Sequence, residues 1–144
     1  MTDIVTDRHV VGPWVADRIN GQFWAENSAA IGLYRGKLVA GVIYENYNLA
    51  SVVCHIAVEG ALTPTYLAAI FDYPFNVLGV RKIVVPVAES NLQSIDFVSK
   101  LGFTKEAQLL DAHPDGSLLL FTMNREQCKF IGERYGKRLK HRMH

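Results

Sequence analysis

The side chains best suited to proton transfer lie in and just after one apolar segment, residues 51–58. His55 interrupts this segment, and Glu59 follows directly after it. Histidine titrates near neutral pH, and a carboxylate beside a reacting group accepts a proton through a water molecule. His55 and Glu59 are therefore the candidate general bases. Each residue also has an interpretation without catalysis: His55 could be a histidine whose hydrogen bonds are satisfied within the fold, and Glu59 could be an ordinary surface residue.

A second group of polar side chains begins the segment from Asn91 to Phe103. Asn91 is a strong helix N-cap, and Gly102 is a typical helix stop. Between them, apolar residues at spacing three predict a helix whose core face holds Leu92, Ile95, Val98 and Leu101. The apolar strand 81–87 precedes this helix, and ligands of open α/β sheets bind at such strand ends. Asn91 is either a cap alone or a cap that also contacts a ligand.

Length and composition predict one globular domain. The 144 residues are 49% apolar and 20% charged, with a net charge of +1, so the whole chain has no general attraction to nucleic acid or membrane. No apolar run reaches the roughly 18 residues of a membrane span, and nothing at the N-terminus resembles a secretory signal. Cys54 and Cys128 form neither a disulfide framework nor a metal-binding pair. We therefore expect a cytoplasmic protein without a metal site.

The order of expected elements indicates a mixed sheet with helices. It runs as helix, three antiparallel strands, helix, strand, helix and two strands, because periodicity and turn residues alternate in that way. Thr63 and Pro64 suit a helix start, whereas Pro74 should interrupt that helix. The other expected segments are a helix over 12–19, with Pro13 near its start, strands over 30–35, 38–44 and 51–58, and a hairpin over 103–123.

Residues 79–125 resemble the second half of the GNAT superfamily of acyl-CoA-dependent N-acyltransferases. The resemblance rests on Gly79-Val80-Arg81-Lys82-Ile83, then Asn91, Ser94, Lys100-Leu101-Gly102-Phe103 and Glu106. It is closest to the branch of ribosomal-protein N-terminal acetyltransferases. This resemblance implies an α/β (α+β) fold with a mostly antiparallel sheet of about six or seven strands and helices on both faces. The implied activity is acetyl transfer from acetyl-CoA to the primary amine of a small molecule or of a protein N-terminus.

The resemblance also implies a position for the cofactor. Acetyl-CoA would lie between the strand ending near Val58 and the strand ending near Val87, with its pyrophosphate at the next helix N-terminus. Backbone groups of 56–58 would face the thioester. The implied cofactor-binding residues are Ile56, Ala57, Val58, Thr63, Thr65, Tyr66, Asn91 and Ser94.

Two departures from the family pattern favour a different function. In the family's phosphate loop, this chain has Glu59 in place of Gln or Arg, Leu62 in place of Gly, and Pro64 in place of Gly or Ala. The second departure is Val98, which replaces a proton-donating Tyr. Glycines permit close backbone approach to a phosphate, and valine has no proton to give. The alternative is therefore a catalytically degenerate GNAT-fold module that binds a partner protein or RNA.

Aromatic and basic residues near the chain ends suggest further contacts. Trp14, Phe23 and Trp24 either wall an acceptor pocket or pack within the fold. We expect the domain to cover residues 1–128, followed by a basic tail over 129–144. Such a tail is either a solubilising end or a weak contact for nucleic acid or an acidic protein. Its charged residues are Lys129, Arg134, Lys137, Arg138, Lys140 and Arg142, against Glu133.

Overall fold

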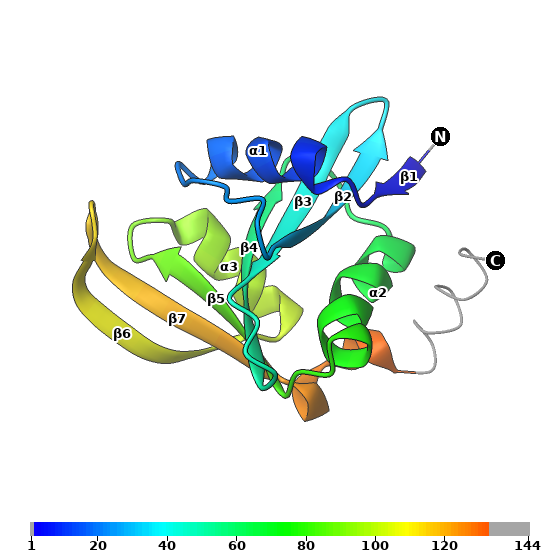
Figure 1. Ribbon diagram of the computed structural model, residues 1–144. Coiled ribbons are helices and arrows are strands. Elements are labelled where there is room, and N and C mark those ends of the chain that lie inside the picture. Colours follow the sequence, from blue (N-terminus) through cyan, green and yellow to red (C-terminus); the bar gives the residue numbers. More distant parts are fainter. Residues whose placement is uncertain (1, 133–144) are drawn as a thin grey trace.

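The computed structural model describes residues 2–132 and is built around one seven-stranded sheet with the order β1-β2-β3-β4-β5-β7-β6 (Figure 1). Only β4 and β5 pair in parallel; every other neighbouring pair is antiparallel. The predicted mixed, mostly antiparallel sheet is thereby confirmed. The strands are β1 (Thr2–Val5), β2 (Ala29–Arg35), β3 (Leu38–Glu45), β4 (Ser51–Val58), β5 (Lys82–Ala88), β6 (Thr104–His113) and β7 (Gly116–Asn124).

Helices cover both faces of the sheet. Helix α1 (Arg8–Arg18) packs on one face, where Val11 and Val15 join a core cluster with residues of β2, β3 and β4. Helices α2 (Pro64–Asp72) and α3 (Leu92–Leu101) contribute to the main core cluster on the other face. Shorter helical turns are η1 (Tyr73–Val77), η2 (Arg125–Gln127) and η3 (Lys129–Ile131).

Two glycines allow α1 to lie close to the sheet. A Cβ added at Gly41 would lie 2.6 Å from the side chain of Val15, and one at Gly32 would lie 2.8 Å from Val11. Neither contact is compatible with normal packing, so side chains larger than hydrogen are excluded there. The close approach fixes α1 against β2 and β3.

The predicted start of the first helix was wrong, and the first strand was not predicted. Helix α1 begins at Arg8, capped by Asp7, so Pro13 lies inside the helix and not near its start. Burial of Val11 and Val15 outweighs the lost backbone hydrogen bond at the proline. Strand β1 was not predicted, because four residues give too short an alternating pattern and the strand exists through its pairing with β2.

The core face of α3 also differs from the prediction. Val98 and Leu101 are buried as expected, but Leu92 is 74% exposed. Leu92 is the first helical residue and extends beyond the neighbouring core. Spacing alone therefore assigned one residue too many to the buried face. The expected interruption near Pro74 is confirmed, since α2 ends at Asp72 and the π-type turn η1 follows.

Pairing between β4 and β5 ends early. The two strands pair only from Ser51–Val53 to Lys82–Val84, so residues 54–58 of β4 and 85–88 of β5 are not partners. The carbonyl of Ala50 accepts from Arg81 on the β5 side, whereas the N–H of Glu59 donates to Val39 on the β3 side. Backbone polar groups alternate in direction along a strand. Those of Ile56 and Val58 therefore point toward β5 beyond the paired stretch, and we call them the unpaired β4 edge.

Candidate functional site

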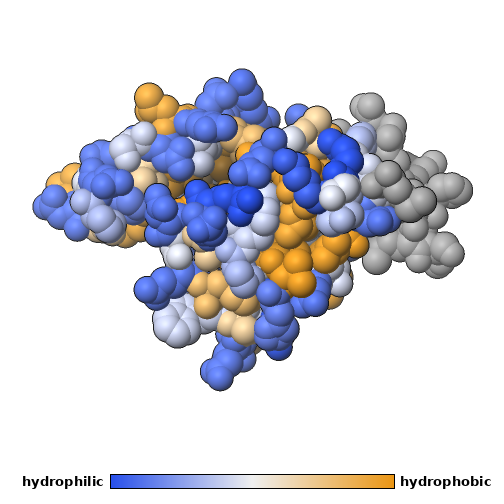
Figure 2. Space-filling view, turned by 90° about the horizontal axis from the view of Figure 1, so that it is seen from above, coloured by the Kyte–Doolittle hydropathy of each residue, from blue (hydrophilic) through white to orange (hydrophobic). Residues whose placement is uncertain are grey.

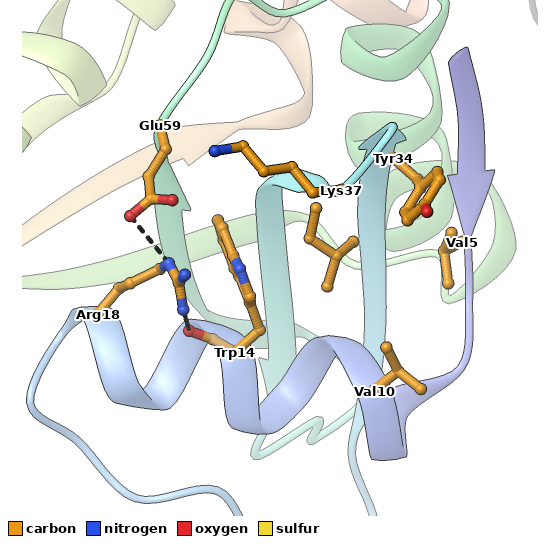
Figure 3. Close-up of a pocket in the computed structure, with 8 residues that line it drawn as sticks. Val5, Val10, Trp14, Arg18, Tyr34, Lys37 and Glu59 are labelled. Carbon is orange, nitrogen blue, oxygen red and sulfur yellow. Dashed lines mark hydrogen bonds and ion pairs between the residues drawn. The ribbon is translucent and has the colours of Figure 1, made fainter. Parts of the chain in front are cut away.

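A pocket of about 540 Å³ lies between α1, β1, the β2–β3 turn and the carboxyl end of β4 (Figure 3). This volume falls within the range of about 300–1,000 Å³ typical of small-molecule sites. Figure 3 shows the acidic and basic side chains at one end and aliphatic side chains at the other. The lining residues are Val5, Val10, Trp14, Arg18, Tyr34, Lys37, Leu38 and Glu59.

Glu59 is held at the pocket by the last turn of α1. Its Oε2 lies 3.0 Å from Nε of Arg18. Arg18 in turn donates from Nη1 to the carbonyl of Trp14 at 3.1 Å, and its guanidinium lies 3.9 Å from the Trp14 ring centroid. Because both charged side chains are partly exposed, the ion pair contributes at most about 1 kcal/mol to stability. Its effect is to orient the Glu59 carboxylate.

Arg18 was not among the residues predicted for the site. It lies 41 positions from Glu59 in the chain, and no local pattern links the last turn of a helix to the end of a distant strand. For Trp14 the sequence left two alternatives, an acceptor-pocket wall or packing within the fold, and in the structure Trp14 lines this pocket. Phe23 packs against Gly12 instead, and Trp24 is 67% exposed.

His55 has a partner within the sheet. Its Nε2 lies 2.6 Å from Oε1 of Glu45, and both side chains are about one quarter exposed. The two come together because the β3–β4 hairpin places Ile43 opposite His55 and Glu45 two positions further on. This contact fits the interpretation that His55 is satisfied within the fold, with Glu45 as its partner. His55 and Glu59 are four residues apart, about 13 Å along a strand, so the structure keeps the two candidate bases apart.

The neighbouring cysteine is not part of this site. Cys54 belongs to the core cluster on the face opposite α1, and burial raises the pKa of its thiol. Because successive side chains of a strand point to opposite faces, Cys54 and His55 lie on different faces of the sheet. A buried thiol with a raised pKa is a poor nucleophile.

The three predicted cofactor-binding residues of β4 do not point the same way. Ile56 and Val58 belong to the unpaired β4 edge, whereas the alternation turns the backbone groups of Ala57 toward β3. Two residues thus present unpaired backbone donors and acceptors toward β5. Buried backbone groups of this kind ordinarily find a partner, which makes the edge suitable for a bound carbonyl.

The start of α2 uses its polar groups within the protein. Oγ1 of Thr63 accepts from the N–H of Tyr66 at 3.1 Å, which confirms Thr63 as the cap. The Tyr66 side chain is 1% exposed, and its hydroxyl donates to the carbonyl of Ile31 in β2 at 2.8 Å. Arg35 of β2 likewise donates to the carbonyl of Ala61. The loop before α2 therefore lies beside β2, and the predicted phosphate contacts of Thr63, Thr65 and Tyr66 stay predictions.

The start of α3 is more exposed. Oδ1 of Asn91 accepts from the N–H of Ser94 at 3.1 Å, so the cap assigned to Asn91 is confirmed. Asn91 itself is exposed and Ser94 is half-buried. This helix N-terminus follows the carboxyl end of β5, on the other side of the unpaired stretch. Contact of Asn91 and Ser94 with a cofactor stays a prediction.

Comparisons with known proteins give structural matches only. No protein-family model matches the sequence, and no curated protein matches it. A mutant of the spermidine N-acetyltransferase SpeG from Vibrio cholerae matches with a TM-score of 0.71 at 13% identity, covering 92% of this chain and 98% of that one. A mutant form of the spermidine/spermine N-acetyltransferase SpeG matches at 0.69 with 14% identity, covering 96% and 99%. The dodecameric spermidine N-acetyltransferase matches at 0.66 with 12% identity, covering 87% and 94%.

This chain has a GNAT-type fold. Val98, which the sequence resemblance aligns with a position where GNAT members often carry a tyrosine, is 2% exposed and packed into the core. Its side chain serves packing, and no proton donor occupies that position.

Among residues 2–132, no group of three or more His, Cys, Asp or Glu side chains is placed to hold a metal ion. Within the same residues, no helix is long and apolar enough to cross a membrane. Most of the predicted basic tail lies outside the described residues.

Proposed function

We propose that the protein is an N-acetyltransferase that transfers the acetyl group of acetyl-CoA to the primary amine of a small molecule. One observation carries this proposal: the early end of the β4–β5 ladder leaves the unpaired β4 edge next to Glu59 and its pocket. The GNAT-type fold supports it, since the solved proteins of similar structure are named as N-acetyltransferases. The residues present fit the thioester because Ile56 and Val58 offer backbone N–H groups toward β5.

The reaction joins a neutral amine nitrogen to the carbonyl carbon of the thioester. The C–N bond forms, the C–S bond breaks, and the thiolate leaves. The N–H groups of Ile56 and Val58 donate to the carbonyl oxygen as it gains negative charge. Glu59 accepts, through a water molecule, the proton that the amine nitrogen loses. His55, bonded to Glu45, is the second candidate for this proton.

The remaining contacts belong to the two helix starts. Asn91 and Ser94 at α3 are proposed to contact the cofactor; Thr63 and Thr65 at α2, which the family resemblance also implies, are the alternative position for its phosphates. Helix N-termini favour anions, because their first N–H groups lack partners within the helix. Acetylation of a protein N-terminus, as in the ribosomal-protein branch, is a second acceptor class. We propose that the reaction takes place in the cytoplasm.

Calorimetric titration with acetyl-CoA tests the proposal. Saturable binding is expected, with an increase in thermal stability that follows RT ln(1 + [L]/Kd). Release of CoA is then measured over a panel of small amines and an N-terminal peptide, with hydrolysis subtracted. Absence of binding at millimolar acetyl-CoA would overturn the proposal.

Two variants assign the base. Glu59→Gln should lower kcat by about 10²–10⁴-fold and remove its rise with pH if Glu59 accepts the proton. His55→Gln serves as the comparison, because it keeps a polar side chain beside Glu45. If only His55→Gln changes the pH profile, the base is His55 and not Glu59.

A binding module without catalysis is the second candidate. The internal hydrogen bonds of Thr63 and Tyr66 and the buried Val98 favour it, because they remove groups that the family uses for the cofactor. Failure of acetyl-CoA binding, together with saturable and salt-sensitive RNA binding, would support this alternative.

A further inference from the structure

The pocket beside Glu59 has one polar end and one apolar end. Arg18, Lys37 and Glu59 form the polar end, and Lys37 extends toward Glu59 in Figure 3. Val5 and Val10 form the apolar end, with the Tyr34 ring beside them (Figure 3), and Leu38 is a further apolar lining residue. The shape suits a ligand with a charged head and an apolar body.

The apolar end is accessible to a ligand. Val10 is 51% exposed and Tyr34 is 41% exposed. On the side of the molecule where α1 lies, the surface seen from above shows an apolar strip between hydrophilic side chains (Figure 2). Covering apolar surface stabilises a complex by roughly 25 cal/mol per Å² removed from water. An apolar group on the ligand therefore adds to affinity here.

The polar end has an excess of positive charge. Arg18 pairs with Glu59 at 3.0 Å, whereas the ammonium group of Lys37 has no ion pair or hydrogen bond with any other residue in the range 2–132. Two cations thus face one carboxylate, a local sum of +1. A polyamine would add further positive charge, while a ligand that carries its own carboxylate balances the site.

We propose that the acetyl acceptor is an α-amino acid with a large apolar or aromatic side chain; this inference rests on the proposed transferase function. Its α-amine lies at Glu59 and its α-carboxylate at Lys37 and Arg18. These two groups share one carbon atom, so they require opposite charges close together, which the 3.0 Å Arg18–Glu59 pair supplies. The side chain extends between Val5, Val10 and Leu38. The acceptor then differs in charge from the spermidine named for the structurally similar proteins.

Calorimetry on the full chain, without acetyl-CoA, compares L-phenylalanine, 2-phenylethylamine and spermidine. Phenylethylamine keeps the ring and the amine but lacks the carboxylate. A charge-assisted hydrogen bond to that carboxylate should make phenylalanine bind about tenfold or more tightly than phenylethylamine. Spermidine should bind most weakly. Equal affinity for phenylalanine and phenylethylamine, or tighter binding of spermidine, would overturn the assignment.

Lys37→Met tests the source of the preference. Lys37 is exposed, and methionine keeps the apolar stem, so folding should be unaffected. The preference for phenylalanine should fall to about threefold or less when the ammonium is removed. Lys105→Met is the matched control, because Lys105 is exposed on β6 and away from the pocket; it should leave the preference unchanged. An unchanged preference in Lys37→Met would contradict the assigned carboxylate contact.

The two proposals fail in different ways. Selective phenylalanine binding without any acetyl-CoA binding would remove the transferase function and leave an amino-acid pocket. Acetyl transfer that prefers spermidine or phenylethylamine would keep the transferase function and overturn the acceptor class.

Discussion

Helices α2 and α3 follow the carboxyl ends of two parallel strands and begin with the same kind of cap, but their first turns have different surroundings. Thr63 and Asn91 each accept from the N–H three residues later at 3.1 Å. Tyr66 in the first turn of α2 is buried against β2, whereas Leu92 in the first turn of α3 is 74% exposed. A cap fixes where a helix begins, but it does not decide whether the first turn can meet a ligand.

The largest expected effect is on the free energy of unfolding, because the first turn of α2 is buried and that of α3 is exposed. Tyr66→Ala should lower the free energy of unfolding by about 3–5 kcal/mol, because it removes a buried ring and its hydrogen bond. Leu92→Ala, at an exposed position, should change it by less than about 0.5 kcal/mol. Urea denaturation measures both. Equal losses would show that Leu92 packs against the core in solution.

The two caps should contribute equally to stability. Thr63→Ala and Asn91→Ala should each cost about 1 kcal/mol, because each leaves one helix N–H without its acceptor. Thr63→Ser and Asn91→Ser keep an acceptor oxygen and are the controls. A serine variant as unstable as its alanine counterpart would mean that the cap is not the source of the loss.

The Kd for acetyl-CoA should depend on the first turn of α3 more than on that of α2. Ser94→Ala should raise the Kd for acetyl-CoA about three- to tenfold if its hydroxyl bonds the cofactor, because α3 begins in an exposed position beside the unpaired stretch of β5. Thr65→Ala should change the Kd by less than about twofold, which is less than the loss of a typical hydrogen bond would cause. The reason is that the loop before α2 lies against β2. A larger effect of Thr65→Ala would place the phosphates at α2, as the family resemblance implies.

The smallest effect concerns pH. Neither helix has an acidic residue in its first turn, so the two cap effects should not depend on pH in the acidic range. Elsewhere, hydrogen bonds from Lys82 and then Thr122 lower the pKa of Glu106. A lowered folded-state pKa means that the stabilisation is present above the ordinary glutamate pKa of about 4.3 and is lost as the pH falls below it.

Glu106→Gln should therefore reduce the loss of stability between neutral and acidic pH. Because this carboxylate is exposed, the change should be small. Unfolding curves for Glu106→Gln and the two cap variants provide the measurement. Cap effects that shrink on acidification would show that a carboxylate acts at one of the helix starts.

The local signals of the sequence were reliable where the deciding contact lies within a few residues. Thr63 and Asn91 cap the helices that they were predicted to cap, and Gly102 takes the left-handed conformation at the end of α3. The central position of the strand containing His55 was also predictable, since apolar residues on both faces indicate a strand covered on both sides.

What the sequence by itself determined is the order of most elements, their caps and turns, and a mixed sheet with helices on both faces. Tertiary structure decided that α1 starts before Pro13, that Leu92 stays outside the core, and that Arg18 meets Glu59. It also decided that the β4–β5 ladder ends at Val53 and Val84, which exposes the edge proposed for the thioester. The physical reason is range: capping and turn preferences act over three or four residues, whereas burial, register and long-range ion pairs depend on how the whole sheet and its helices pack.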